Sequence, residues 1–131
     1  IGLGIPAEPL FRSASIHSPT AKIYDEYCKS DIYVLSSRHE GLGMSLIEAM
    51  SCGIPCVAFD CKYGPAEILT NRETGLLVED GNVAELAKAM LWLIEHPEER
   101  LRMGLAARES AKRYSKDNIM HHWVELFDRL S

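Results

Sequence analysis

The sequence has no excess of positive charge. It carries 14 Lys and Arg residues against 19 Asp and Glu residues, which gives a formal net charge of -5 at pH 7. A protein that binds a nucleic-acid backbone needs a basic surface, so nucleic acid is excluded as the main partner. Any phosphate that this chain binds must be held by a few local groups.

Long apolar runs are also missing. The apolar stretches are broken by Glu, Lys or Gly well before the roughly 18 residues that cross a bilayer, so we expect no transmembrane segment. The chain starts at Ile1, and residues 1–6 lack the basic start of a secretion signal. With 47% hydrophobic residues, the sequence is sufficient for one core. We therefore interpret residues 1–131 as a single domain cut from a longer protein.

The four cysteines include no Cys-x2-Cys pair. Cys52, Cys56 and Cys61 are separated by three and by four other residues, no patterned His accompanies them, and Cys28 stands apart. Zinc sites usually contain a Cys-x2-Cys pair or patterned His ligands. We therefore assign no metal site and expect the cysteines to be small buried residues of a reducing compartment.

Short apolar runs alternate with longer helical patterns along the chain. Residues 32–35 and 56–59 are apolar runs rich in β-formers, residues 76–78 form a shorter run, and residues 10–16 could supply a fourth. Alternation of this kind is typical of a parallel sheet with crossover helices. The sequence predicts an α/β fold, with helices flanking the sheet.

Four helices are predicted between and after these strands. The first covers residues 44–51 and ends at Gly53. The second begins with a capping-box-like pair, Asn82 and Glu85, and the third begins at Pro97. The second of these helices has an apolar face, which consists of Val83, Leu86, Ala87, Met90, Leu93 and Ile94. The last helix follows Ser115, and we expect its apolar stripe to face the core: Ile119, Met120, Trp123, Val124 and Phe127.

The candidate site is the stretch S-S-R-H-E-G-L-G-M-S-L-I-E-A-M-S-C-G, residues 36–53. It leaves the carboxyl end of a predicted strand, passes through a glycine-containing loop and enters a helix. Ligands of open parallel sheets bind in the crevice at this position. Gly41 and Gly43 let the backbone approach a ligand closely, and the start of the helix suits a diphosphate.

Two carboxylates flank this loop. On one continuous helix Glu40 and Glu48 would point about 80° apart, so we expect Glu40 in the loop and Glu48 inside the helix. A carboxylate accepts hydrogen bonds without donating, so each could bind a diol, one on a ribose and one on a sugar. From residue types and spacing alone, a solvated pair is an equally good interpretation.

The segment E-G-L-G-M-S-L-I-E-A-M-S-C-G-I-P resembles the E-x7-E signature of retaining glycosyltransferase family four and related GT-B enzymes. G-P-A-E-I at residues 64–68 and G-L-L-V at residues 75–78 resemble later motifs of that family, and the resemblance covers residues 20–115. It implies a Rossmann-like domain, the donor-binding C-terminal half of a GT-B fold. The implied reaction moves a hexose from a nucleotide diphosphate sugar, with a UDP-sugar favoured, and retains the anomeric configuration.

The same resemblance implies a role for each residue of the motif. Glu48 would bind the ribose hydroxyls, and Glu40 would lie beside the hexose and position it, as the one candidate for a catalytic role. Four residues would offer backbone amides to the phosphates and the sugar: Gly41, Leu42, Gly43 and Met44. No cofactor and no metal ion is implied beside the donor.

Several parts of the family pattern have no match here. The phosphate-binding Arg and Lys of the family come from a V-G-R strand and a K-G pair, which residues 1–20 do not contain. Arg12 is the one basic Lys or Arg there, and His17 and His39 do not replace the catalytic His of the family's N-terminal domain. We expect that missing domain to bind a glycan or lipid-linked acceptor, and this chain alone to be inactive.

Within the family, the G-P-x-E-I variant resembles capsular and lipopolysaccharide galactosyl- or N-acetylgalactosaminyltransferases. This implies surface polysaccharide synthesis by a cytoplasmic protein, peripheral to the inner membrane face where it contacts the membrane. Lys62 and Tyr63 either shape the donor pocket or form an exposed loop.

Two other functions are open. A non-catalytic nucleotide-binding or interaction module of the same fold is the main alternative, although the presence of both Glu40 and Glu48 argues against it. A nucleotide-sugar epimerase or a polysaccharide synthase fits the combination of E-G-L-G and G-P-A-E-I less well.

Overall fold

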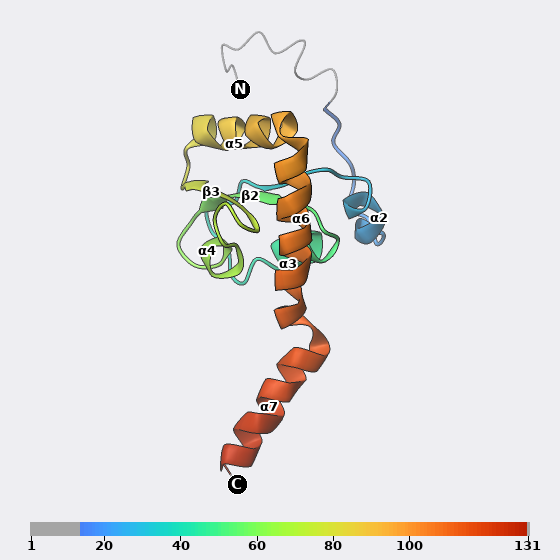
Figure 1. Cartoon of the computed structure of the whole chain (residues 1–131), viewed down its shortest axis with the longest axis vertical. Helices are drawn as coiled ribbons and strands as arrows, with labels where there is room; N and C mark the ends of the chain where they lie inside the picture. The colour runs from blue at the N-terminus through green and yellow to red at the C-terminus, as the bar shows by residue number, and fades with distance from the viewer. Residues whose placement is uncertain (1–13, 131) are drawn as a thin grey trace.

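The computed structural model describes residues 14–130. Figure 1 shows the order of elements along the chain. They are α2 (Ile23–Tyr27), β1 (Tyr33–Leu35), α3 (Met44–Ser51), β2 (Cys56–Asp60), α4 (Pro65–Ile68), β3 (Gly75–Glu79), α5 (Val83–Glu95), α6 (Pro97–Ala111), the 3-10 turn η1 (Lys112–Tyr114) and α7 (Lys116–Leu130).

The three strands form one parallel sheet in the order β1-β2-β3. Tyr33 of β1 is opposite Cys56 of β2, which is opposite Gly75 of β3. A helix leads from each strand to the next, as parallel neighbours require. The predicted α/β class and the predicted strands at residues 32–35, 56–59 and 76–78 are therefore confirmed, each to within one residue at either end.

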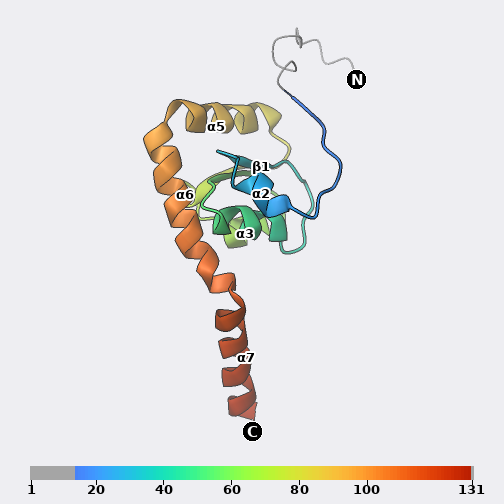
Figure 2. The ribbon, with the colours of Figure 1, turned by 90° about the vertical axis from the view of Figure 1, so that its right-hand side faces the viewer.

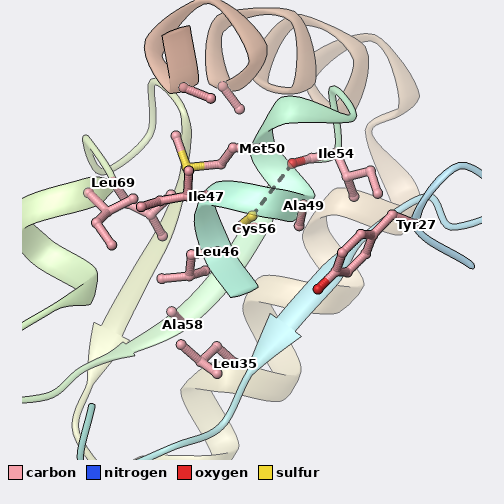
Figure 3. Packing of buried hydrophobic residues seen from close by; sticks show 13 residues of the cluster. Tyr27, Leu35, Leu46, Ile47, Ala49, Met50, Ile54, Cys56, Ala58 and Leu69 are labelled. Atoms are coloured by element: carbon pink, nitrogen blue, oxygen red, sulfur yellow. Dashed lines mark hydrogen bonds between the residues drawn. The ribbon is translucent and has the colours of Figure 1, made fainter. Parts of the chain in front are cut away.

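Helices cover both faces of this sheet. The side chains of β2 alternate between the two faces, and each set packs in its own hydrophobic cluster. Cys56 and Ala58 join the cluster under α3, to which α2, α4 and α6 also contribute (Figure 3). Val57 and Phe59 point to the other face and pack with Leu86 and Leu93 of α5 and with Met103 of α6. The result is a three-layer arrangement in which both faces of the sheet are buried.

Local signals place the helix ends as the sequence predicts. Helix α3 covers Met44–Ser51, and the chain turns out of it at Gly53, whose φ is 78°. At the start of α5 the Asn82 side chain accepts a hydrogen bond of 3.1 Å from the Glu85 backbone N–H. The Glu85 carboxylate does not complete a capping box, because it accepts a bond of 2.7 Å from Lys88 instead.

Three other predictions need correction. Residues 14–16 of the predicted fourth strand are not a strand, and residues 10–13 lie outside the described residues. Cys28 is exposed, whereas Cys56 and Cys61 are buried and Cys52 is half-buried. The buried side of α5 is rotated from the predicted face: Leu86 and Leu93 are buried, but Val83 and Ile94 are exposed.

The predicted role of the last helix is wrong. Helix α7 has no buried residue, and Trp123 and Phe127 of its apolar stripe are 51% and 60% exposed. Figures 1 and 2 show why, because α6 runs along the body and α7 continues away from it. The apolar stripe exists, but the described part of this chain does not cover it.

No helix among residues 14–130 is both long enough and apolar enough to cross a membrane.

Candidate functional site

The site begins where the three parallel strands end. Their carboxyl ends share one edge of the sheet, and each leads into a loop before a helix: residues 36–43 before α3, residues 61–64 before α4 and residues 80–82 before α5. An exposed ion pair of 3.3 Å between Arg38 and Asp80 joins the first and third loops. A pair this exposed adds little stability, but it shows that the two loops lie side by side.

The start of α3 is open to a ligand. Gly43 occupies the N-cap position in a left-handed conformation, with φ 70° and ψ 46°, and no side chain caps the helix there. The first turn contains no acidic residue that would compete for its positive end. The Leu46 N–H donates to the Gly43 carbonyl oxygen at 3.0 Å. The N–H groups before it lie at the positive end of the helix, which can accept an anion.

The backbone of the second loop packs directly on the first. A Cβ atom added to Gly64 would lie 3.1 Å from the Gly41 carbonyl oxygen and 3.2 Å from the Glu40 Cβ atom. Gly64 has a φ of 101°, and Tyr63 before it has an unusual positive φ of 67°. The G-P-A-E-I motif therefore has a local purpose: its glycine lets this loop support the Glu40–Gly41 backbone.

The two carboxylates lie where the sequence predicts, one in the loop and one in the helix. Glu40 is half-buried four residues before the start of α3, and Glu48 is half-buried in its second turn. The charges of both carboxylates act on Tyr33 of β1. Burial, then the neighbouring Cys56, Glu40 and Glu48, raises the pKa of Tyr33, while a hydrogen bond with Ser45 opposes the rise. The two carboxylates therefore belong to different elements, the loop before α3 and α3 itself.

A groove of about 400 Å³ runs beside α3. Met44 and Glu48 of the predicted site line it on one side, and Arg108 and Lys112 line it on the other. Its volume lies in the range of small-molecule sites. Arg108 comes from α6 and lies beside Gly53, past the end of α3, and Lys112 of η1 forms an ion pair with Glu109.

The structure brings some of the predicted residues together and leaves others apart. Glu40, Gly41 and Gly43 lie in the loop, Met44 and Glu48 line the groove, and Leu42 is 52% exposed. Lys62 and Tyr63 are exposed on the second loop, with the Lys62 ammonium 5.1 Å from the centre of the Tyr63 ring. His39 is exposed, and no cluster of His, Cys, Asp and Glu suited to a metal ion occurs within residues 14–130.

Sequence reasoning did not find Arg108, Lys112 or Tyr27. The two cations are four residues apart on one side of α6 and η1, a spacing that also fits a solvated helix surface. Tyr27 donates a hydrogen bond of 3.3 Å to the Glu48 carboxylate, yet 21 residues separate the two in sequence. Only the packing of α2 on α3 brings them together.

Comparison with known proteins identifies what this arrangement is similar to. The model of the family described as "Glycosyl transferases group 1" matches residues 16–110. The chain is 37% identical over 98 residues to a poly(ribitol-phosphate) alpha-N-acetylglucosaminyltransferase of Staphylococcus aureus, covering 74% of this chain and 20% of that protein. It is 38% identical over 120 residues to the amylovoran biosynthesis glycosyltransferase AmsD of Erwinia amylovora, covering 91% of this chain and 33% of that protein.

Solved structures share the fold. A variant of S. aureus TarM, crystallised with fondaparinux, alpha-GlcNAc-glycerol and UDP, has a TM-score of 0.83 at 32% identity, covering 92% of this chain and 24% of that one. The C-terminal domain of the glycosyl transferase group 1 protein LpcC of Francisella tularensis has a TM-score of 0.69 at 25% identity, covering 79% of this chain and 53% of that one. The chain spans a fifth to a third of the two curated relatives named above.

Proposed function

Because this chain belongs to the glycosyl transferases group 1, we propose that it is the donor-binding part of a retaining glycosyltransferase that moves a hexose from a UDP-sugar. The observation that carries the proposal is the uncapped start of α3 beside a groove that contains Glu48. A crystal structure of TarM, which shares this fold at 32% identity, was obtained with UDP. This supports a nucleotide diphosphate as the occupant.

In this proposal the diphosphate lies at the positive end of α3. The backbone N–H groups of Gly41, Leu42, Gly43 and Met44 donate to the phosphates and the sugar. These groups stabilise the negative charge that develops on the leaving diphosphate. We propose that no metal ion takes part and that no cofactor is needed.

The two carboxylates divide the recognition of the donor. Glu48 accepts hydrogen bonds from the ribose hydroxyls within the groove, and Glu40 accepts them from the hexose in the loop before the helix. Hydrogen bonds to a charged acceptor are stronger than neutral ones. Glu40 thereby fixes the orientation of the hexose, and with it the anomeric carbon that carries the leaving diphosphate. This is a positioning role.

The proposal extends to the rest of the protein. We propose an N-terminal domain, outside this chain, that binds a glycan or lipid-linked acceptor and completes the active site, so that this chain alone is inactive. Relatives named for poly(ribitol-phosphate) and amylovoran synthesis favour a role in surface polysaccharide synthesis. Such a protein would work in the cytoplasm, peripheral to the inner membrane face.

Calorimetric titration of this chain with UDP, GDP, ADP and their hexose conjugates, in the presence and in the absence of EDTA, tests the donor site. We expect selective binding of UDP and UDP-sugars. Glu48→Ala should weaken the binding of both by about 1.5 to 3 kcal/mol, because charge-assisted hydrogen bonds are lost. EDTA should have no effect.

Glu40→Ala is the matched variant, because it removes the other carboxylate of the site. It should weaken the binding of the UDP-sugar more than that of UDP. Equal losses for the two ligands would show that the carboxylate roles are assigned wrongly, and an unchanged affinity of Glu48→Ala would refute its ribose role. Failure of every nucleotide to bind, even after the N-terminal domain is restored, would favour the interaction module.

A further inference from the structure

Tyr27 reaches the predicted site from an element that the family motif does not include. It is the last residue of α2, its side chain is 7% exposed, and its hydroxyl donates a hydrogen bond of 3.3 Å to Glu48 Oε2 on α3. Figure 3 shows its ring at the margin of the core cluster, beside β1. A buried hydroxyl needs a hydrogen-bond partner, and here the Glu48 carboxylate is that partner.

Neighbouring rings fix the direction of this hydroxyl. The Tyr27 ring meets Tyr33 of β1 edge to face, with centroids 5.8 Å apart and planes at 78°, and meets Tyr24 similarly at 6.0 Å and 77°. Edge-to-face contacts of this kind favour one ring orientation. The ring therefore holds its hydroxyl toward α3 without depending on a bound ligand.

The Tyr27 hydroxyl also keeps its proton, and so remains a donor, at neutral pH. Burial, followed by the charges of Tyr33 and Glu48, raises the pKa of Tyr27 further above its ordinary value. A neutral phenol donates its one proton and a carboxylate can only accept, so the direction of the bond is determined. The bond occupies one lone pair of Oε2, and the carboxylate keeps further lone pairs for other donors.

We propose that Tyr27 is a positioning residue for ribose recognition: by holding one oxygen of Glu48, it orients the carboxylate so that its remaining lone pairs receive the ribose 2′- and 3′-hydroxyls. The inference rests on the proposed ribose role of Glu48. Without the bond from Tyr27, a half-buried glutamate on the groove wall samples several rotamers, and ordering it on binding weakens the affinity.

The test compares the affinities of this chain, with its N-terminal domain present if UDP binding requires it, for UDP and for 2′,3′-dideoxy-UDP. The second ligand lacks the two hydroxyls that Glu48 would bind. Unsubstituted protein should prefer UDP, and Glu48→Gln should remove most of that preference. Tyr27→Phe keeps the ring and should reduce the preference about twofold to tenfold through weaker UDP binding, leaving the affinity for the dideoxy ligand unchanged. The double variant should match Glu48→Gln alone.

Tyr33→Phe is the matched control, because it removes the hydroxyl of the neighbouring ring, whose hydrogen-bond partner is Ser45. It should keep the preference for UDP. The inference is overturned if Tyr27→Phe keeps the full preference while Glu48→Gln loses it, or if Tyr33→Phe loses as much as Tyr27→Phe. If Glu48→Gln itself keeps the preference, the ribose role proposed for Glu48 fails, and the role of Tyr27 fails with it.

Discussion

At the scale of single residues, the site depends on two glycines with different duties. Gly64 has a φ of 101° and lies against the backbone of Glu40 and Gly41, so it has neither the conformation nor the space for a side chain. A Cβ atom on Gly41, in contrast, would meet nothing within 4 Å. Gly64 therefore supports the loop, whereas the space at Gly41 is open for a ligand.

Gly64→Ala should destabilise the fold by about 1 to 3 kcal/mol, because it adds backbone strain and a close contact with the Gly41 carbonyl. Urea unfolding followed by circular dichroism measures the change. Gly41→Ala is the control, and its free energy of unfolding should stay within about 0.5 kcal/mol of the unsubstituted value. Equal losses for the two variants would mean that the loops do not pack as described.

Within one continuous segment of the candidate site, the sequence was sufficient to predict the element in which each residue lies. Glu40, Gly41, Gly43, Met44 and Glu48 belong to one strand-to-helix turn, where position in sequence and position in space are closely linked. Tyr27 and Arg108 reach the same region from α2 and α6. Their proximity depends on helix packing, which no local pattern encodes, so a single sequence could not reveal them.

At the scale of elements, α6 lies so close to the end of α3 that a side chain would not fit between their backbones. A Cβ atom on Gly104 of α6 would overlap the carbonyl of Gly53, the residue where the chain turns out of α3. Backbone atoms at such a turn have little room to move. The pair of glycines therefore sets the distance at which α6 packs on α3, and with it the width of the groove.

Gly104→Ala should destabilise the protein by about 1 to 3 kcal/mol, even though alanine is the better helix former. Leu105→Ala, at an adjacent but 60% exposed position, should have a much smaller effect. Thermal unfolding of both variants measures the two changes in stability. A stabilised Gly104→Ala protein would mean that helix propensity outweighs the contact and that α6 packs less closely.

The helices also show how far periodicity predicts packing. The ends of α3 and α5 were predictable because Gly53 and Asn82 act within one turn. The buried face of α5 was predicted with a rotation, and that of α7 was predicted wrongly. An apolar stripe indicates that one side of a helix avoids water, but the identity of what covers it depends on elements elsewhere.

At the scale of the whole molecule, α7 stands apart from the body that holds the site. Its contacts are chiefly with η1, and its last-turn Arg129 and first-turn Asp117 are exposed along with the apolar stripe. Trp123 and Phe127 stack on each other along the helix, with centroids 5.9 Å apart. Helix α7 is therefore an appendage of the described domain, not one of its layers.

Trp123→Ser should leave the unfolding free energy of this chain within about 1 kcal/mol of the unsubstituted value, because half of the indole is already in water. Leu93→Ala, a fully buried position of α5, should cost about 2 to 5 kcal/mol. Chemical unfolding at low protein concentration measures both. A large loss for Trp123→Ser would show that α7 packs on the body.

The strand order has a consequence for synthesis on the ribosome. Because β1, β2 and β3 are neighbours in the same order as they are translated, β2 and β3 each find a partner already made when they emerge. Helix α6, however, contributes Ala107 and Ala111 to one core cluster and Met103 to the other. A nascent chain that ends before α6 thus has a sheet with both sides incompletely closed, and it would be expected to engage chaperones until α6 leaves the exit tunnel.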